Sequence, residues 1–223
     1  MIKLNHTVQV KIDDTFVTVV KDFIEKKMAF INPRQKHAID VLRFYQTEPG
    51  FEKFVTRLKQ MPYESFSAIR SNGLVYFKAV TKQIMMNYPG RSDRDPDRGK
   101  LDIGAYTIYM STHAALHGNV NEIHFIPARN PLAPSKASCT HQRHMHHLAD
   151  FRPDIHKHSN PLTYTPRTCW GSFSSMIPAI AQDGDLVELF RVLYLFASIW
   201  NPNSPLARLE QLIKIYKRVE RTP

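Results

Sequence analysis

The first fifty residues carry two hydrophobic periods, one typical of a strand and the other typical of helices. Residues 6–12 alternate between apolar and polar side chains, which predicts a half-buried strand. Beyond Asp13, an acceptable N-cap, apolar residues recur at helical spacing and predict a helix over about 14–27. Asn32 precedes a proline, as an N-cap precedes a first helical position, and we expect a second helix over about 33–46.

The segments that follow also predict helices. Apolar spacing favours a short helix over 51–58, and Pro62 is placed to open another that carries Phe66 and Ile69. A further apolar stripe runs from Leu74 to Met85. The N-terminal half is therefore expected to be mainly helical.

The C-terminal half has a different character. Residues 91–100 alternate acids and bases around a proline and a glycine, which predicts an exposed loop between domains. Strand patterns over 101–110 and 120–126 flank turn residues and predict a β-hairpin. Residues 127–170 contain six prolines, so we expect an irregular segment. Two closing helices are expected over about 184–200 and 204–219.

These elements predict an α+β protein that is mainly helical. The expected parts are an N-terminal module, a helical extension and a C-terminal body that contains the hairpin, the irregular segment and two helices. Their bounds are 1–48, 49–90 and 101–223, respectively.

Charge narrows the classes of partner. The chain has 30 Lys and Arg against 20 Asp and Glu, a formal net charge of +10, which favours nucleic acid first and anionic membrane second. The first ten residues lack the pattern of a secretory signal. The most apolar stretch, 186–200, carries two charges and is shorter than the roughly 20 residues of a membrane-spanning helix. We therefore expect a cytoplasmic protein that does not act at a membrane.

The strand, helix, link and helix of residues 5–46 together resemble the ribbon-helix-helix DNA-binding family. The resemblance implies that two chains pair their N-terminal strands into a ribbon that enters the major groove. Outward strand residues would contact bases, and the N-terminus of the second helix would bind a phosphate. The matching positions are Thr7, Gln9 and Lys11 in the strand and Asn32, Arg34 and Gln35 at the helix.

The resemblance also implies a homodimer, because a lone seven-residue strand leaves backbone groups unpaired. The shared core would consist of Phe16, Val20, Phe23, Ile24, Val41, Leu42 and Tyr45. Some plasmid-borne regulators of conjugation join such a module to a larger body, and this chain is similar to them in architecture. The alternative is that residues 6–12 form an ordinary strand in a mixed sheet.

A second group of residues is suited to metal binding. Histidines and two cysteines crowd the irregular segment, and the best zinc candidates are Cys139, His141, His144 and Cys169. The spacing matches no familiar zinc finger, so the favoured interpretation is a polar loop with no cofactor. Zinc stays the alternative.

A third group of residues has side chains suited to catalysis. His113, His117, His124 and Glu122, with Asp102 nearby, could supply a general base or a metal-dependent nuclease centre. The chain has no phosphate loop, nucleophile elbow or HExxH motif, so we do not expect an enzyme. The prediction is a homodimeric, sequence-specific regulator of transcription that binds double-stranded DNA and recruits polymerase or another regulator. The alternatives are a viral or phage protein that binds RNA or single-stranded DNA, or a metal-dependent nuclease that uses the histidine-rich region.

Overall fold

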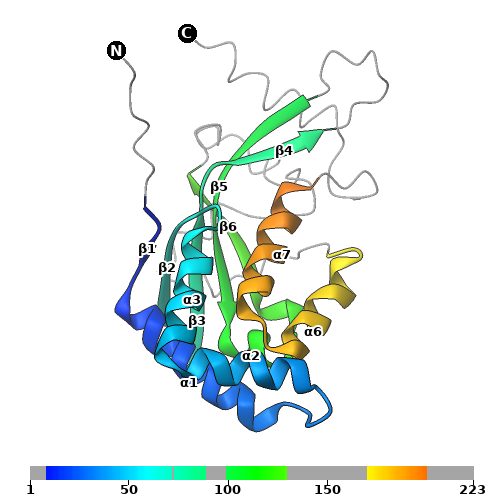
Figure 1. Cartoon of the computed structure of the whole chain (residues 1–223). Helices are drawn as coiled ribbons and strands as arrows, with labels where there is room; N and C mark the ends of the chain where they lie inside the picture. Colours follow the sequence, from blue (N-terminus) through cyan, green and yellow to red (C-terminus); the bar gives the residue numbers. More distant parts are fainter. Residues whose placement is uncertain (1–8, 72, 89–98, 130–169, 200–223) are drawn as a thin grey trace.

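The computed structural model describes residues 9–71, 73–88, 99–129 and 170–199, which form a mixed α and β fold (Figure 1). The strands are β1 (Lys11–Ile12), β2 (Tyr63–Ser71), β3 (Leu74–Thr81), β4 (Ile84–Tyr88), β5 (Gly99–Ser111) and β6 (Ile123–Arg129). The helices are α1 (Asp14–Phe30), α2 (Lys36–Gln46), α3 (Glu48–Lys59), α4 (Thr112–His117), α6 (Phe173–Asp183) and α7 (Leu186–Ser198), with a 3-10 turn, η1, at Val120–Glu122. The expected α+β class is confirmed.

The six strands described form one mixed sheet. β1 lies at an edge and runs parallel to β2, whereas the other pairs are antiparallel. β3 and β4 follow one another along the same side of the long strand β5, and β6 pairs with the other side of β5. β4 and β5 therefore pair across the acidic and basic segment 91–100, so this segment joins two neighbouring strands.

One face of the sheet carries the main core. The ring of Phe16 in α1 lies 5.3 Å from that of Phe66 in β2, 5.6 Å from that of Phe77 in β3 and 6.2 Å from that of Phe190 in α7. All four side chains are at most 1% exposed. One continuous cluster of buried residues thus draws on α1, the sheet and α7.

Several helices follow from local sequence. Asp13 caps α1, because its side chain accepts a hydrogen bond from the amide of Phe16 at 2.7 Å, and the predicted helix is confirmed. The helix expected at 51–58 is confirmed within α3, and the one expected at 184–200 is α7. The last predicted helix, 204–219, lies outside the described residues, as does the predicted irregular segment apart from its ends.

The helical prediction for residues 62–85 is wrong, since these residues form β2, β3 and the first two residues of β4. The cause is a break in the strand period. Tyr63 and Phe66 are three apart, as on a helix face, yet both are buried in the sheet. The pairing shifts between Tyr63 and Ser65, and the extra residue of this bulge turns both rings to the same side. A helical spacing therefore arose from an irregular strand.

The described residues show no ribbon-helix-helix module. Of the predicted strand, the structure describes residues from 9 onward, and Lys11–Ile12 pair in parallel with Ser65 and Phe66 of the same chain. The seven residues expected to form a dimer core are buried or partly buried within this chain's own core. Because the strand and the apolar helix faces find partners inside the chain, neither of them needs a second copy.

The predicted hairpin is confirmed, as β5 and β6 pair antiparallel. Its connection is longer than a simple turn, because it contains α4 and η1. α4 ends at Gly118, whose φ of 74° lies in the left-handed region that glycine adopts easily. Among the helices described, none is long and apolar enough to cross a membrane.

Candidate functional site

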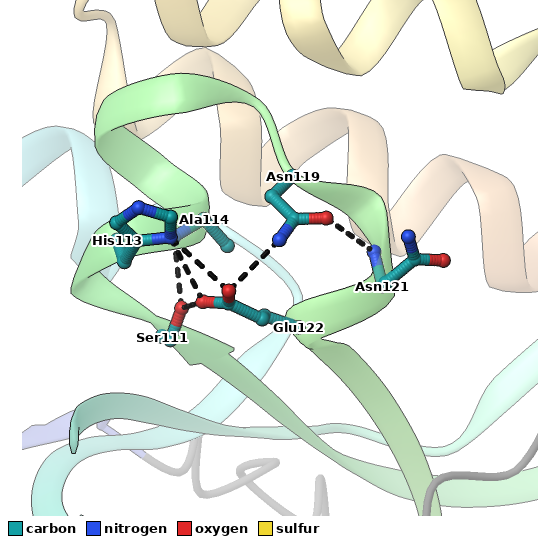
Figure 2. Close-up of polar contacts among 6 residues, drawn as sticks. All are labelled: Ser111, His113, Ala114, Asn119, Asn121 and Glu122. Atoms are coloured by element: carbon teal, nitrogen blue, oxygen red, sulfur yellow. Dashed lines mark hydrogen bonds and ion pairs between the residues drawn. The ribbon is translucent and has the colours of Figure 1, made fainter. Parts of the chain in front are cut away.

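The connection between β5 and β6 brings several polar side chains together (Figure 2). Ser111 ends β5 and caps α4, since its hydroxyl accepts a hydrogen bond from the amide of Ala114 at 2.8 Å. Asn119 likewise caps η1 by accepting from the amide of Asn121 at 3.2 Å. Two short capped elements thus fix this corner of the sheet.

Glu122 is the centre of the cluster. Its carboxylate accepts hydrogen bonds from the side-chain amide of Asn119 at 2.8 Å and from the hydroxyl of Ser111. The third contact is with Nδ1 of His113, at 3.1 Å from Oε1. The Glu122 side chain is 24% exposed, so part of the carboxylate is shielded from solvent. The carboxylate is therefore held in one orientation by groups from both sides of the connection.

This contact determines which nitrogen of His113 is available. An ionised carboxylate can only accept hydrogen bonds, so Nδ1 of His113 donates to Glu122 and Nε2 carries the lone pair when the ring is neutral. In Figure 2 the second ring nitrogen lies on the far side of the ring from Glu122. The His113 side chain is 52% exposed. An oriented imidazole of this kind can act as a base or as a metal ligand.

His117 lies next to His113 on α4. The two residues are four positions apart, which places them on the same side of a helix, and their ring centroids are 4.6 Å apart. His117 is exposed, and its ring lies 6.2 Å from that of Phe30 in α1. The structure thus brings His113, His117 and Glu122 together, as the sequence suggested.

The other two members of the predicted catalytic group lie elsewhere. His124 is 3% exposed and packs against Tyr76 on the face of the sheet opposite the main core, with ring centroids 6.3 Å apart. Burial lowers the pKa of His124, although the charge of Glu122 opposes this, so the site favours the neutral ring. Asp102 lies on β5 nine positions before Ser111, roughly 30 Å along the strand. Neither residue belongs to the exposed cluster.

The predicted zinc ligands Cys139, His141, His144 and Cys169 lie outside the described residues. Within the part of the chain that is described, no group of three or more His, Cys, Asp or Glu is arranged to hold a metal ion.

The predicted DNA-binding strand is only partly described, because Thr7 lies outside the described residues. Gln9 and Lys11 are exposed, as expected for outward positions. Their strand, however, is attached to β2 of the same chain rather than to a twin strand. The paired ribbon that would present Gln9 and Lys11 to bases is therefore not present in the described fold.

The predicted phosphate clamp at the second helix is also altered. α2 begins at Lys36, three residues later than expected. The amide of Arg34 donates to the side chain of Asn32 at 2.9 Å, and the amide of Gln35 donates to the Asn32 carbonyl at 2.9 Å. The side-chain amide of Gln35 donates to the carboxylate of Asp183, the last residue of α6, at 3.4 Å. These groups are occupied within the chain, so only the exposed Arg34 side chain stays available for a phosphate.

The exposed side of α2 carries two basic residues, Lys36 and Arg43, that were not among the predicted DNA contacts, and it lies beside Arg34, which was. We call it the α2 face and define it as Arg34, Lys36, Asp40, Arg43 and Phe44, all of which are exposed. Lys36 and Arg43 are seven residues apart, the spacing that places two residues on one side of a helix, and this spacing was visible in the sequence. Among the described residues, none of its three basic side chains makes an ion pair.

Phe44 extends this surface toward α3. Its ring is 42% exposed, and the ammonium group of Lys53 lies 5.7 Å from the ring centroid. The described part of the chain holds 16 Lys and Arg against 13 Asp and Glu, so its surface as a whole is nearly balanced. The α2 face, with three basic residues to one acidic residue, is locally more basic than its surroundings.

Comparison of the chain with models of protein families, with curated proteins and with solved structures finds no match. Function must therefore be inferred from the residues of the chain itself.

Proposed function

We propose that the protein binds nucleic acid and that the α2 face contacts the phosphate backbone. The observation that carries this proposal is that Arg34, Lys36 and Arg43 are exposed and make no ion pair with any residue that the structure describes, although Asp40 also lies on the α2 face. Unpaired cations on a surface are free to replace the counterions of a polyanion. The net charge of +10 supports the same class of partner.

The spacing on α2 suits backbone contacts better than base recognition. Lys36 and Arg43 are separated by seven residues, or roughly 10 Å along the helix. Phosphates of one DNA strand follow each other every 3.4 Å of the axis, so the two side chains would reach different phosphates. Arg34 would add a third contact, and the exposed ring of Phe44 offers a face on which an unpaired base can stack.

This proposal replaces the paired-ribbon mechanism. Sequence-specific regulation by a homodimer depended on strand residues 6–12 of two chains, and these residues join a sheet within one chain as far as they are described. Regulation of transcription stays a prediction. Whether the protein binds double-stranded DNA, single-stranded DNA or RNA is decided by the experiment that follows.

Salt-dependent binding tests the proposal directly. Affinities of the full chain for labelled duplex DNA, single-stranded DNA and RNA are measured by fluorescence anisotropy between 50 and 200 mM salt. Lys36→Glu and Arg43→Glu should each weaken binding and reduce the slope of log affinity against log salt by about 1. The matched control is Lys59→Glu, which makes the same charge change at an exposed position on α3.

Equal effects of the control and the α2 variants would mean that only net charge matters and that the α2 face is not the interface. Absence of binding to all three nucleic acids at 50 mM salt would reject the proposal as a whole. Preference for one duplex sequence would favour the regulator, whereas preference for single strands would favour the alternative RNA- or DNA-binding protein.

A further inference from the structure

The two histidines of α4 are spaced as ligands of one metal ion would be. Nitrogen ligands lie 2.0–2.1 Å from zinc, which puts an imidazole centroid about 3.2 Å from the metal. Two such rings are then about 4.5 Å apart at a right angle and about 5.2 Å apart at a tetrahedral angle. The observed separation of the His113 and His117 centroids, 4.6 Å, falls within this range.

Glu122 supplies the second element of such a site. Histidines that bind metals almost always donate their other ring N–H to a carboxylate, a carbonyl or water, which fixes the ring and strengthens the ligand. His113 makes this contact through Nδ1, while Nε2 faces away from the cluster (Figure 2). Ser111 and Asn119 hold the carboxylate in turn, so the orientation of His113 is set before any ion binds.

A purely structural role explains only part of the cluster. Ser111 and Asn119 cap α4 and η1, and their contacts with Glu122 tie the two elements together. His113 and His117, in contrast, are both exposed, and their ring centroids lie 4.6 Å apart on the surface. A ligand that binds two imidazoles at once would fit this arrangement.

We propose that His113 and His117 bind a divalent transition-metal ion such as Zn²⁺ or Cu²⁺, with Glu122 as the residue that orients His113. Imidazole nitrogens favour these ions over Mg²⁺ and Ca²⁺, and Cu²⁺ binds such a site more tightly than Zn²⁺. Two protein ligands leave coordination positions open to water or to another ligand. This site is separate from the α2 face and does not depend on nucleic-acid binding.

The test uses the full chain and inorganic ions. Zn²⁺ and Cu²⁺ are titrated into the wild-type protein and into the double variant His113→Asn/His117→Asn, with isothermal titration calorimetry as the readout. The double variant should bind one equivalent fewer, whatever the cysteines and histidines of residues 139–169 contribute to both proteins. Glu122→Gln should keep that equivalent but weaken its affinity about 10- to 100-fold.

A control removes one histidine elsewhere. His37→Asn changes an exposed histidine on α2 and should bind metal as the wild type does. NMR spectra of the ring protons identify the ligands, since Zn²⁺ should shift the resonances of His113 and His117. Circular dichroism checks that each variant is folded.

Three results would overturn the proposal. One is an unchanged number of equivalents and an unchanged affinity in the folded double variant. Another is a set of His113 and His117 resonances that Zn²⁺ leaves in place. The third is loss of the equivalent in the His37 control as well, because any exposed histidine would then suffice.

Discussion

Phe16 offers the sharpest test of a core formed within one chain. Its ring is 1% exposed and lies within about 6 Å of three other phenylalanine rings, those of Phe66, Phe77 and Phe190. Replacement of a buried Phe by Ala costs about 3–5 kcal/mol, because apolar contacts are lost and a cavity is left. At about 2–4 °C per kcal/mol for a chain of this length, Phe16→Ala should lower the Tm by roughly 6–20 °C.

The assays are thermal and urea unfolding followed by circular dichroism, at protein concentrations that differ tenfold. The apparent stabilities of the wild type and of Phe16→Ala should each be the same at both concentrations, because the ring packs inside its own chain. In a core shared between two chains, tenfold dilution would change the apparent stability by about 1.4 kcal/mol. Phe16→Leu keeps much of the volume and should cost less than about 1.5 kcal/mol, so a folded variant is available if the alanine variant unfolds. A cost below about 1 kcal/mol for Phe16→Ala, or an apparent stability of the wild type that falls on dilution, would refute the reasoning.

Three further predictions concern other contacts. Asp13→Ala removes the cap of α1 and should lower the free energy of unfolding by about 1 kcal/mol in urea titrations, whereas no loss would show that the cap is dispensable. Gly118→Ala should destabilise the protein more than Gly73→Ala. Both glycines have φ near 75°, but a Cβ added at Gly118 would lie 2.5 Å from Cα of Pro178, whereas one added at Gly73 would lie within 4 Å of nothing. Equal melting temperatures of the two variants would contradict this packing. Burial lowers the pKa of Lys27 from 10.5, with Asp183 opposing, so the unfolded chain holds this proton to higher pH than the folded chain. The free energy of unfolding of the wild type, relative to that of Lys27→Met, should therefore rise as the pH increases toward 10.5. If this difference in free energy stays constant between pH 7 and 10.5, the prediction is wrong.

Elements governed by local chemistry were predictable from the sequence. The helix after Asp13 depends on a capping side chain and on apolar residues at helical spacing, and both are written in consecutive residues. Elements that depend on distant contacts were not. The alternation of residues 6–12 shows that one face is buried, but it does not reveal that the hydrogen-bond partner of the strand is β2, more than fifty residues away. The alternation of apolar and polar residues is the same whether the strand pairs with β2 or with a strand of a second chain.

The same limit applies to the candidate sites. The sequence placed His113, His117 and Glu122 in one group with His124 and Asp102. Only the pairing of β5 with β6 shows that His124 lies on a buried face and that Asp102 lies far along the strand. Likewise, Gln35 appeared available for a phosphate because its contact with Asp183, a residue that follows much later in the chain, depends on the tertiary fold.

The packing of Phe16 against Phe190 also bears on how the protein is made. The first core helix leaves the ribosome early, while its partner in α7 follows near the end of the described chain. At about 5–20 residues per second, roughly 10–35 seconds of synthesis separate the two rings. During that time the part of the core that packs against α7 lacks its partner, and nascent chains halted before residue 190 should therefore recruit chaperones or aggregate.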